Sequence, residues 1–182
     1  ALELSKLLVS MKDDKGRVLI PDFNKGIEIK QSLLKDLLAV PDSKSYINQQ
    51  IGIAQEVNPQ MTYQESLQYP SLNILNFTSG EPEIGTRNIV PSYAKAALDI
   101  RLVPESDPVY LEMILRKFIS DQGYYIIEDR NPTEAERMRY NKIISFGFKL
   151  HSFAFVTEPD TPTGIWASNM VEKLFGKKPV KI

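Results

Sequence analysis

The alternation of apolar and polar residues between Tyr93 and Val103 is the feature that most restricts the fold of this chain. Every second position is apolar, and the intervening positions include Lys95, Asp99 and Arg101. Side chains alternate between the two faces of a strand. The pattern therefore predicts a strand with one buried face, formed by Ala94, Ala96, Leu98, Ile100 and Leu102, and one polar face.

The segments around this strand predict an α+β fold. Residues 71–79 are rich in Leu, Ile, Phe and Thr and are followed by Gly80, which is typical of a first strand. Asp107 and Pro108 suit the cap and first turn of a helix that ends near Gly123, and a third strand is expected over 124–128. An amphipathic helix opens the chain, with Leu4, Leu7, Leu8 and Met11 on its buried stripe. This order favours an open antiparallel sheet with helices on one face.

The remaining segments are assigned more coarsely. Helical pieces are expected over 26–53 with a break near 41–43, and a helical turn and loop over 58–70. Residues 143–156 are apolar and aromatic, so two extended pieces around Gly147 are expected. A last helix is predicted from Thr161 to Gly176, with a buried stripe of Ala167, Met170, Val171 and Leu174.

Composition excludes several classes of function. The chain of 182 residues has a formal net charge of -1, so no strong field favours nucleic acid or an anionic membrane as partner. No apolar run approaches the roughly 20 residues that span a bilayer. The absence of cysteine excludes disulfides and thiolate metal ligands. The absence of cysteine does not choose a compartment, because a reduced cytoplasm and a bacterial periplasm both tolerate it; of the two, the cytoplasm is favoured.

No catalytic or metal-ligating residue emerges from the sequence. A metallohydrolase needs several His and carboxylate ligands on one ion, and this chain has a single histidine, His151. Motifs for a zinc protease, a nucleophilic serine or a phosphate loop are missing. Two pairs of carboxylates, Glu81 with Glu83 and Glu134 with Glu136, are interpreted as solvated surface.

One group of residues has the chemistry of a binding site. A polar loop over 85–91 joins the first two strands and contains Asn88, and the second strand delivers Arg101. The planar guanidinium of an Arg binds a carboxylate through two parallel contacts, and an Asn adds a neutral donor and acceptor. The competing interpretation is an ordinary surface ion pair between Asp99 and an Arg.

The order of these segments resembles the lid, or dimerisation, domain of one dinuclear-zinc metallopeptidase family. That family includes carnosinase, glutamate carboxypeptidase, aminoacylase, acetylornithine deacetylase and succinyl-diaminopimelate desuccinylase. The resemblance is carried by the sequences Tyr-Pro-Ser-Leu-Asn-Ile at 69–74, Gly-Thr-Arg-Asn-Ile-Val-Pro at 85–91 and Asp-Ile-Arg-Leu-Val-Pro at 99–104, and by the helix start at 107–108. The opening over 1–21 and the end over 175–180 also fit.

The resemblance implies a ferredoxin-like lid over residues 1–157 and the start of the return into a catalytic domain over 158–182. It implies a homodimeric parent enzyme with two zinc ions and a glutamate base, all held outside this chain, which is then inactive alone and binds no metal. The substrate would be a peptide or an N-acyl amino acid, cleaved at an amide bond next to a free carboxylate. Arg101 matches the family's carboxylate-binding Arg, and Asn88 its loop Asn that contacts substrate.

The resemblance also implies departures and leaves alternatives. The family's first lid strand and its lid histidine are expected before Ala1, so the sheet is expected to be incomplete at its first strand, and His151 takes no role from the family. A standalone self-association module with no catalytic parent is the main alternative. A small-molecule binding domain that uses Arg101 alone is a weaker one.

Overall fold

The computed structural model describes residues 1–41, 43–80 and 90–180 of the chain. These residues form two compact units, each made of segments that are distant in the sequence. The first unit comprises Ala1–Lys25, Pro70–Leu102 and Ser106–Ser152. The second unit comprises Gly26–Tyr69, Val103–Glu105 and the segment from Phe153 to the end. No helix in the described ranges is long and apolar enough to cross a membrane.

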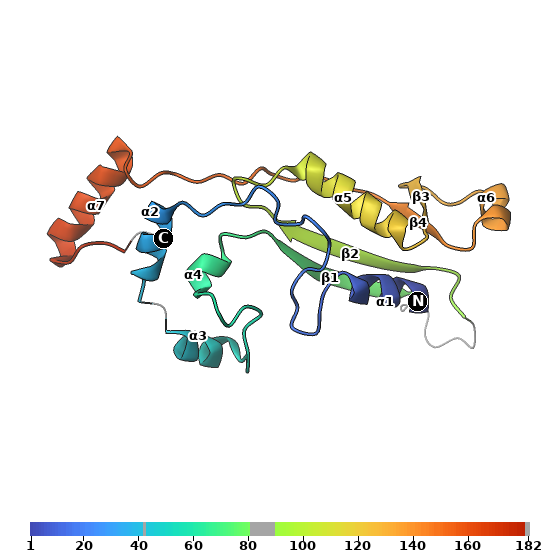
Figure 1. The fold of residues 1–182 in the computed structure, drawn as a ribbon, viewed down its shortest axis with the longest axis horizontal. Helices are drawn as coiled ribbons and strands as arrows, with labels where there is room; N and C mark the ends of the chain where they lie inside the picture. Colours follow the sequence, from blue (N-terminus) through green and yellow to red (C-terminus); the bar gives the residue numbers. More distant parts are fainter. Residues whose placement is uncertain (42, 81–89, 181–182) are drawn as a thin grey trace. The chain divides into compact units, whose positions relative to one another are not determined.

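The first unit contains all the strands of the described chain (Figure 1). Its elements in chain order are α1 (Leu2–Ser10), β1 (Ser71–Ser79), β2 (Ala94–Arg101), α5 (Pro108–Asp121), β3 (Tyr125–Glu128), α6 (Glu134–Arg139) and β4 (Ile143–Phe146). The first strand, the second strand and the long helix α5 occur where the sequence predicts them. The cap of α5 is also as predicted, because the side chain of Asp107 accepts hydrogen bonds from the backbone N–H groups of Val109 and Tyr110.

The strands form two pairs. β1 and β2 pair antiparallel, as predicted. The predicted third strand, β3, pairs with β4 in parallel, which the sequence did not indicate. Within the described residues the two pairs are not hydrogen-bonded to one another. The second extended piece expected after Gly147 is in no strand.

One apolar core joins both strand pairs to α1 and α5. Leu7, Leu8 and Met11 of α1 and four residues of α5 are buried together with Leu72 of β1. The predicted apolar face of β2 packs against this core through Ala96, Leu98, Ile100 and Leu102. Ile126 of β3 and Ile144 of β4 contact the same core. The two helices therefore cover one face of the strands, as expected for this α+β class.

The second unit is helical. It contains α2 (Gln31–Leu38), α3 (Lys44–Ile51), α4 (Tyr63–Ser66) and α7 (Pro162–Phe175). Helix α7 has the bounds that the sequence predicts, from the Thr161 cap to Gly176. Its predicted buried stripe is not buried: no residue of α7 is buried, and the side chain of Leu174 is largely exposed. A period of 3.6 residues identifies an apolar stripe, but the stripe is buried only where other residues cover it.

Candidate functional site

The polar face of the β1–β2 pair carries the candidate binding residues. In the antiparallel register Ser71 lies opposite Arg101, and Asn73 lies opposite Asp99. A β-bulge between Ile74 and Asn76 adds one residue to β1 and reverses the alternation beyond it. Phe77 therefore lies opposite Ala96 on the apolar face. The polar face is formed by Ser71, Asn73, Asn76 and Thr78 of β1 and Lys95, Ala97, Asp99 and Arg101 of β2.

Arg101 lies at the end of β2 with most of its side chain in solvent. Its side chain is 79% exposed, whereas that of Asp99 is 29% exposed. The Nε atom of Arg101 lies 2.6 Å from Oδ2 of Asp99, so the ion pair of the competing interpretation is present. In the part of the chain that the structure describes, the terminal nitrogens Nη1 and Nη2 donate no hydrogen bond. These two nitrogens form one of the two edges of the guanidinium that can bind a carboxylate through two parallel hydrogen bonds.

Asn88, the second predicted contact, lies outside the described residues, as do Glu81 and Glu83. The described chain resumes at Val90, shortly before β2. At the start of β2 the Nζ atom of Lys95 lies 5.4 Å from the ring centroid of Tyr93, which is a cation–π contact. The convergence of Asn88 with Arg101 therefore remains a prediction.

Lys12 contributes to this region although nothing in the sequence pointed to it. It follows α1, and its Nζ atom donates a hydrogen bond of 2.9 Å to the carbonyl oxygen of Leu72. The contact spans 60 positions of the chain, and no local pattern predicts a contact of that range. The lysine joins the segment after α1 to β1.

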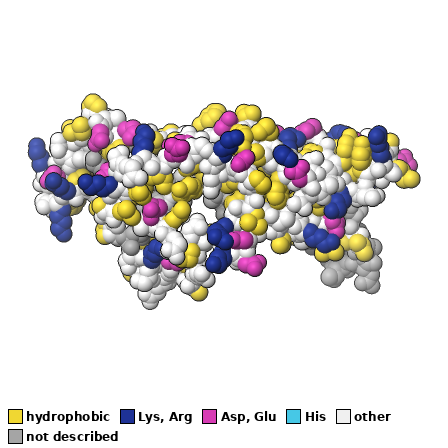
Figure 2. Space-filling view, viewed as in Figure 1, with side chains coloured by type: hydrophobic (Ala, Val, Ile, Leu, Met, Phe, Trp, Pro, Cys, Tyr) yellow, Lys and Arg dark blue, Asp and Glu magenta, His cyan; other side chains and the backbone are white. Residues whose placement is uncertain are grey.

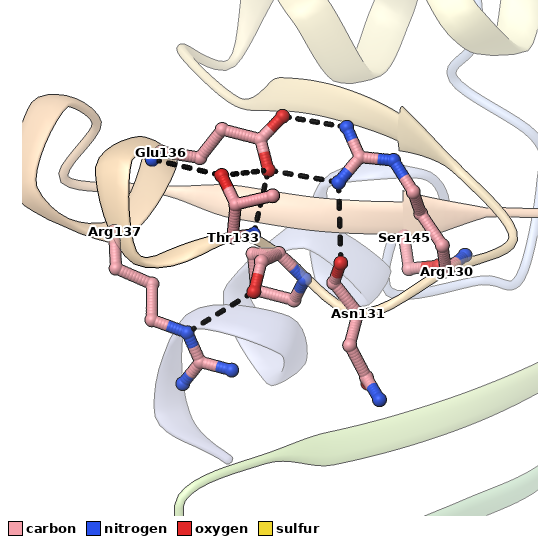
Figure 3. A network of polar contacts seen from close by, with 7 residues as sticks. Arg130, Asn131, Thr133, Glu136, Arg137 and Ser145 are labelled. Carbon is pink, nitrogen blue, oxygen red and sulfur yellow. Dashed lines mark hydrogen bonds and ion pairs between the residues drawn. The ribbon is translucent and has the colours of Figure 1, made fainter.

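Of the carboxylate pair Glu134 and Glu136, Glu136 belongs to a structural network (Figure 3). Thr133 and Glu136 form a capping box at the start of α6. The guanidinium of Arg130 contacts both carboxylate oxygens of Glu136, at 2.5 and 2.8 Å, and the backbone N–H of Arg130 donates to Ser145 Oγ of β4. These contacts hold α6 against the strand pair.

The electrostatics of Glu136 agree with a structural role. The hydrogen bonds from Arg130, and then those from Thr133, lower the pKa of Glu136 from 4.5 to about 2. A general acid or base needs a pKa near the working pH. A carboxylate held so far below that range stays ionised and acts as an anchor for Arg130. The Thr-x-x-Glu spacing in the sequence was the signal that could have identified this cap.

The described residues do not fit a metal site. No group of three or more His, Cys, Asp or Glu side chains within the described ranges is placed to hold a metal ion. The single histidine, His151, is exposed and lies in no described strand. Charged side chains of both signs are interspersed over most of the face drawn in Figure 2. Among the described residues, binding chemistry is thus best represented on the polar face of β1–β2.

Comparison with known families identifies the domain. The sequence profile of the peptidase dimerisation domain, M20_dimer, matches residues 1–125. The chain belongs to this family. The match covers α1, both strands of the antiparallel pair and α5, and it ends at the start of β3. The family resemblance inferred from the sequence is therefore confirmed.

Solved structures share the fold of this peptidase dimerisation domain. Human carnosine dipeptidase 1 is 17% identical with a TM-score of 0.72, over 100% of this chain and 37% of its own. The dipeptidase Dug1p from Saccharomyces cerevisiae is 17% identical with a TM-score of 0.69, over 98% of this chain and 36% of its own. An M20 family metallo-carboxypeptidase, Sso-CP2 from Sulfolobus solfataricus, is 22% identical with a TM-score of 0.68, over 98% of this chain and 38% of its own.

Each match covers a much larger share of this chain than of the solved structure. The chain is covered almost completely, yet it spans less than two fifths of the length of each of the three solved structures. None of the curated proteins compared with the chain matches it. The comparisons therefore establish the family and the fold of this domain.

Proposed function

We propose that this chain is the lid domain of a larger metallopeptidase or amidohydrolase. The observation that carries the proposal is the match of the peptidase dimerisation domain to residues 1–125. The similar solved structures are named as a dipeptidase, a carnosine dipeptidase and a metallo-carboxypeptidase, and each is more than twice as long as this chain. In such a parent the lid pairs with a second copy and helps to bind substrate.

The hydrolytic chemistry is assigned to the rest of the parent. Two zinc ions held there would supply an activated water for attack on the amide. The described residues of this chain do not fit such a site. Their part is to bind one end of the substrate and to join two copies of the enzyme.

Arg101 is proposed to bind the free carboxylate of the substrate. Its terminal nitrogens are open on the polar face, and its Nε atom is held by Asp99. A planar guanidinium pairs with a carboxylate in a bidentate geometry. The favoured substrates are peptides or N-acyl amino acids that are cleaved next to a free carboxylate. Asn88 is proposed as the second contact.

Self-association is proposed to use the outer edge of β1. This strand is nine residues long and contains no charged residue and no proline. Its apolar side chains beyond Asn73 are exposed: Leu75 in the bulge is 66% exposed, and Ile74 and Phe77 are also exposed. Exposed edge strands of monomeric proteins are usually protected by charges or proline. A long strand without charged residues of its own favours pairing with a second copy.

Two measurements test this function. Light scattering of the chain over a concentration series is expected to give the mass of a dimer, and a monomer at every concentration would contradict pairing through these residues. In the parent enzyme, Arg101→Ala is expected to raise KM for a carboxylate substrate about 10- to 100-fold, since bonds to charged groups contribute roughly 1.5–3 kcal/mol. An unchanged KM would contradict the role of Arg101.

A further inference from the structure

The contact between Asp99 and Arg101 leaves the binding end of the guanidinium open. The two residues are two positions apart on β2, so they lie on the same face of the strand. The contact is made by Nε of Arg101, at 2.6 Å from Oδ2 of Asp99. Because Nε is the nitrogen nearest the chain, the fork formed by Nη1 and Nη2 lies farther out. Asp99 therefore leaves open the Nη1/Nη2 edge of Arg101, to which a carboxylate can bind in a bidentate geometry.

The side chains that lie opposite the pair on β1 are neutral. Asn73, opposite Asp99, donates a hydrogen bond of 3.2 Å from Nδ2 to Oγ of Ser71, which lies opposite Arg101. Among the described residues, these two side chains are hydrogen-bonded to one another and not to Asp99 or Arg101. Among the described residues, Asp99 forms an ion pair only with Arg101, and Arg101 only with Asp99. Within that part of the chain, nothing else fixes this long side chain in one direction.

We propose that Asp99 is a positioning residue for substrate binding. It holds the Nε side of Arg101, so that the terminal fork is directed at the free carboxylate of a peptide or N-acyl amino acid. This inference rests on the proposed function of Arg101. Ordering a flexible Arg costs conformational entropy when a ligand binds, and an ion pair formed beforehand removes part of that cost.

The negative charge of Asp99 has a second, opposite effect. It repels the carboxylate of the substrate, which would weaken binding. The repulsion is small because Asp99 is already paired at 2.6 Å with an Arg whose side chain is 79% exposed, so that water and salt screen the charges. A solvent-exposed pair also contributes little to stability. Removal of the Asp99 charge is therefore expected to change the affinity for substrate and to leave the free energy of unfolding nearly unchanged.

The test uses the parent enzyme with Asp99→Asn, which removes the charge at nearly constant shape. KM and kcat are measured for a dipeptide that the enzyme hydrolyses and for the same dipeptide with its carboxylate converted to an amide. We expect KM for the free dipeptide to rise about tenfold, the size of one charge-assisted contact, with kcat unchanged. KM for the amide is expected to stay constant. Asp99→Glu, which keeps a carboxylate on this face, is expected to restore most of the affinity.

A matched control is Asp121→Asn, which removes a carboxylate from the exposed Lys117–Asp121 pair on α5 and is expected to change neither KM. An unchanged or lower KM of Asp99→Asn for the free dipeptide would overturn the inference, and so would an equal rise for the amide. Arg101→Ala separates the two proposals. If it raises KM while Asp99→Asn does not, only the positioning role fails; if neither variant changes KM, the carboxylate anchor fails as well.

A second measurement uses the chain of 182 residues itself. Nuclear magnetic relaxation of the Arg101 Nε–H group reports how strongly the guanidinium is ordered. The order is expected to fall in Asp99→Asn and to remain in Asp121→Asn. Equal order in all three proteins would show that Asp99 does not hold the side chain, and would overturn the inference independently of catalysis.

Discussion

Arg116 of α5 binds both carboxylate oxygens of Glu128 on β3. Its Nη1 atom donates to Oε1 of Glu128 at 2.7 Å, and its Nη2 atom donates to Oε2 at 2.9 Å. The Nε atom of the same guanidinium donates to Glu112 at 2.9 Å, and the group lies 4.7 Å from the ring centroid of Phe146 on β4. One side chain therefore ties α5 to both strands of the parallel pair.

Replacement of Arg116 is expected to destabilise the domain. Arg116→Ala removes a bidentate ion pair, a helical ion pair and a cation–π contact from a side chain that is only 29% exposed. The expected loss in the free energy of unfolding is about 1–2 kcal/mol, which exceeds the value of one exposed pair. Urea unfolding measures it. Lys117→Ala, which breaks the exposed pair with Asp121 on the same helix, is the control and is expected to cost less than about 0.5 kcal/mol. Equal losses would contradict a special role for Arg116.

The network around Glu136 is expected to make the α6 region sensitive to acid. The pKa of Glu136 is lowered from 4.5 to about 2 in the folded chain, mainly by Arg130. A group with a lowered folded pKa stabilises the fold above its ordinary pKa, and that stabilisation is lost as pH falls through the folded pKa. The contribution of Glu136 is thus complete above about pH 4.5 and declines toward pH 2.

Amide hydrogen exchange at Thr133 and in α6, followed from pH 5 to pH 2 with correction for intrinsic rates, tests this dependence. Glu136→Gln is expected to remove most of the pH-dependent loss of protection. Glu134→Gln, on the first turn of the same helix, serves as the matched control and is expected to behave as the parent chain does. The same acid profile in both variants would contradict the assignment to Glu136.

Local patterns in the sequence predicted the elements better than their pairing. The bounds of β1 and α7 follow from the glycines and prolines around them, and the polar face that carries Arg101 follows from strict alternation in β2. The pairing of β3 with β4 depends on contacts across the core, which alternation does not encode. The bulge at Leu75, which returns Asn76 and Thr78 to the polar face, also has no local signal.

Gly164 is expected to be essential for the start of α7. Its backbone N–H donates to Oγ1 of Thr161 at 3.2 Å, and a Cβ atom at this position would collide with the backbone carbonyl of Pro159. Gly164→Ala is therefore expected to destabilise the start of the helix by about 1–3 kcal/mol, the usual cost of overpacking. Without the collision, Ala would stabilise a helix by about 1 kcal/mol relative to Gly. A fall in the stability of the helix start in Gly164→Ala would therefore indicate the collision, and a rise would indicate that there is none.

Trp166, the single tryptophan, lies on the first turns of α7 and provides the measurement. Its fluorescence during thermal unfolding is expected to change at lower temperature in Gly164→Ala. Thr163→Ala replaces the exposed neighbour and is expected to leave the transition unchanged. An unfolding temperature of Gly164→Ala equal to or above that of the parent chain would show that the backbone at Pro159 moves to accommodate the added methyl group.

Leu75→Lys tests whether the edge of β1 joins two copies of the domain. Leu75 is exposed in the bulge of an uncharged strand, so a lysine there leaves the core intact. A charge on a strand edge opposes pairing with another strand, because burial of the unpaired charge between two copies is costly. The dissociation constant of the dimer is expected to rise about 10- to 100-fold, equivalent to roughly 1.4–2.8 kcal/mol.

Val109→Lys provides the matched comparison, since Val109 is also a largely exposed apolar residue, on α5 in the same unit. Both variants gain one positive charge, so a general effect of charge would weaken association equally. Light scattering over a concentration series is expected to give monomers for Leu75→Lys at concentrations where Val109→Lys remains dimeric. If Val109→Lys dissociates and Leu75→Lys does not, the association surface includes the exposed side of α5 and not the β1 edge.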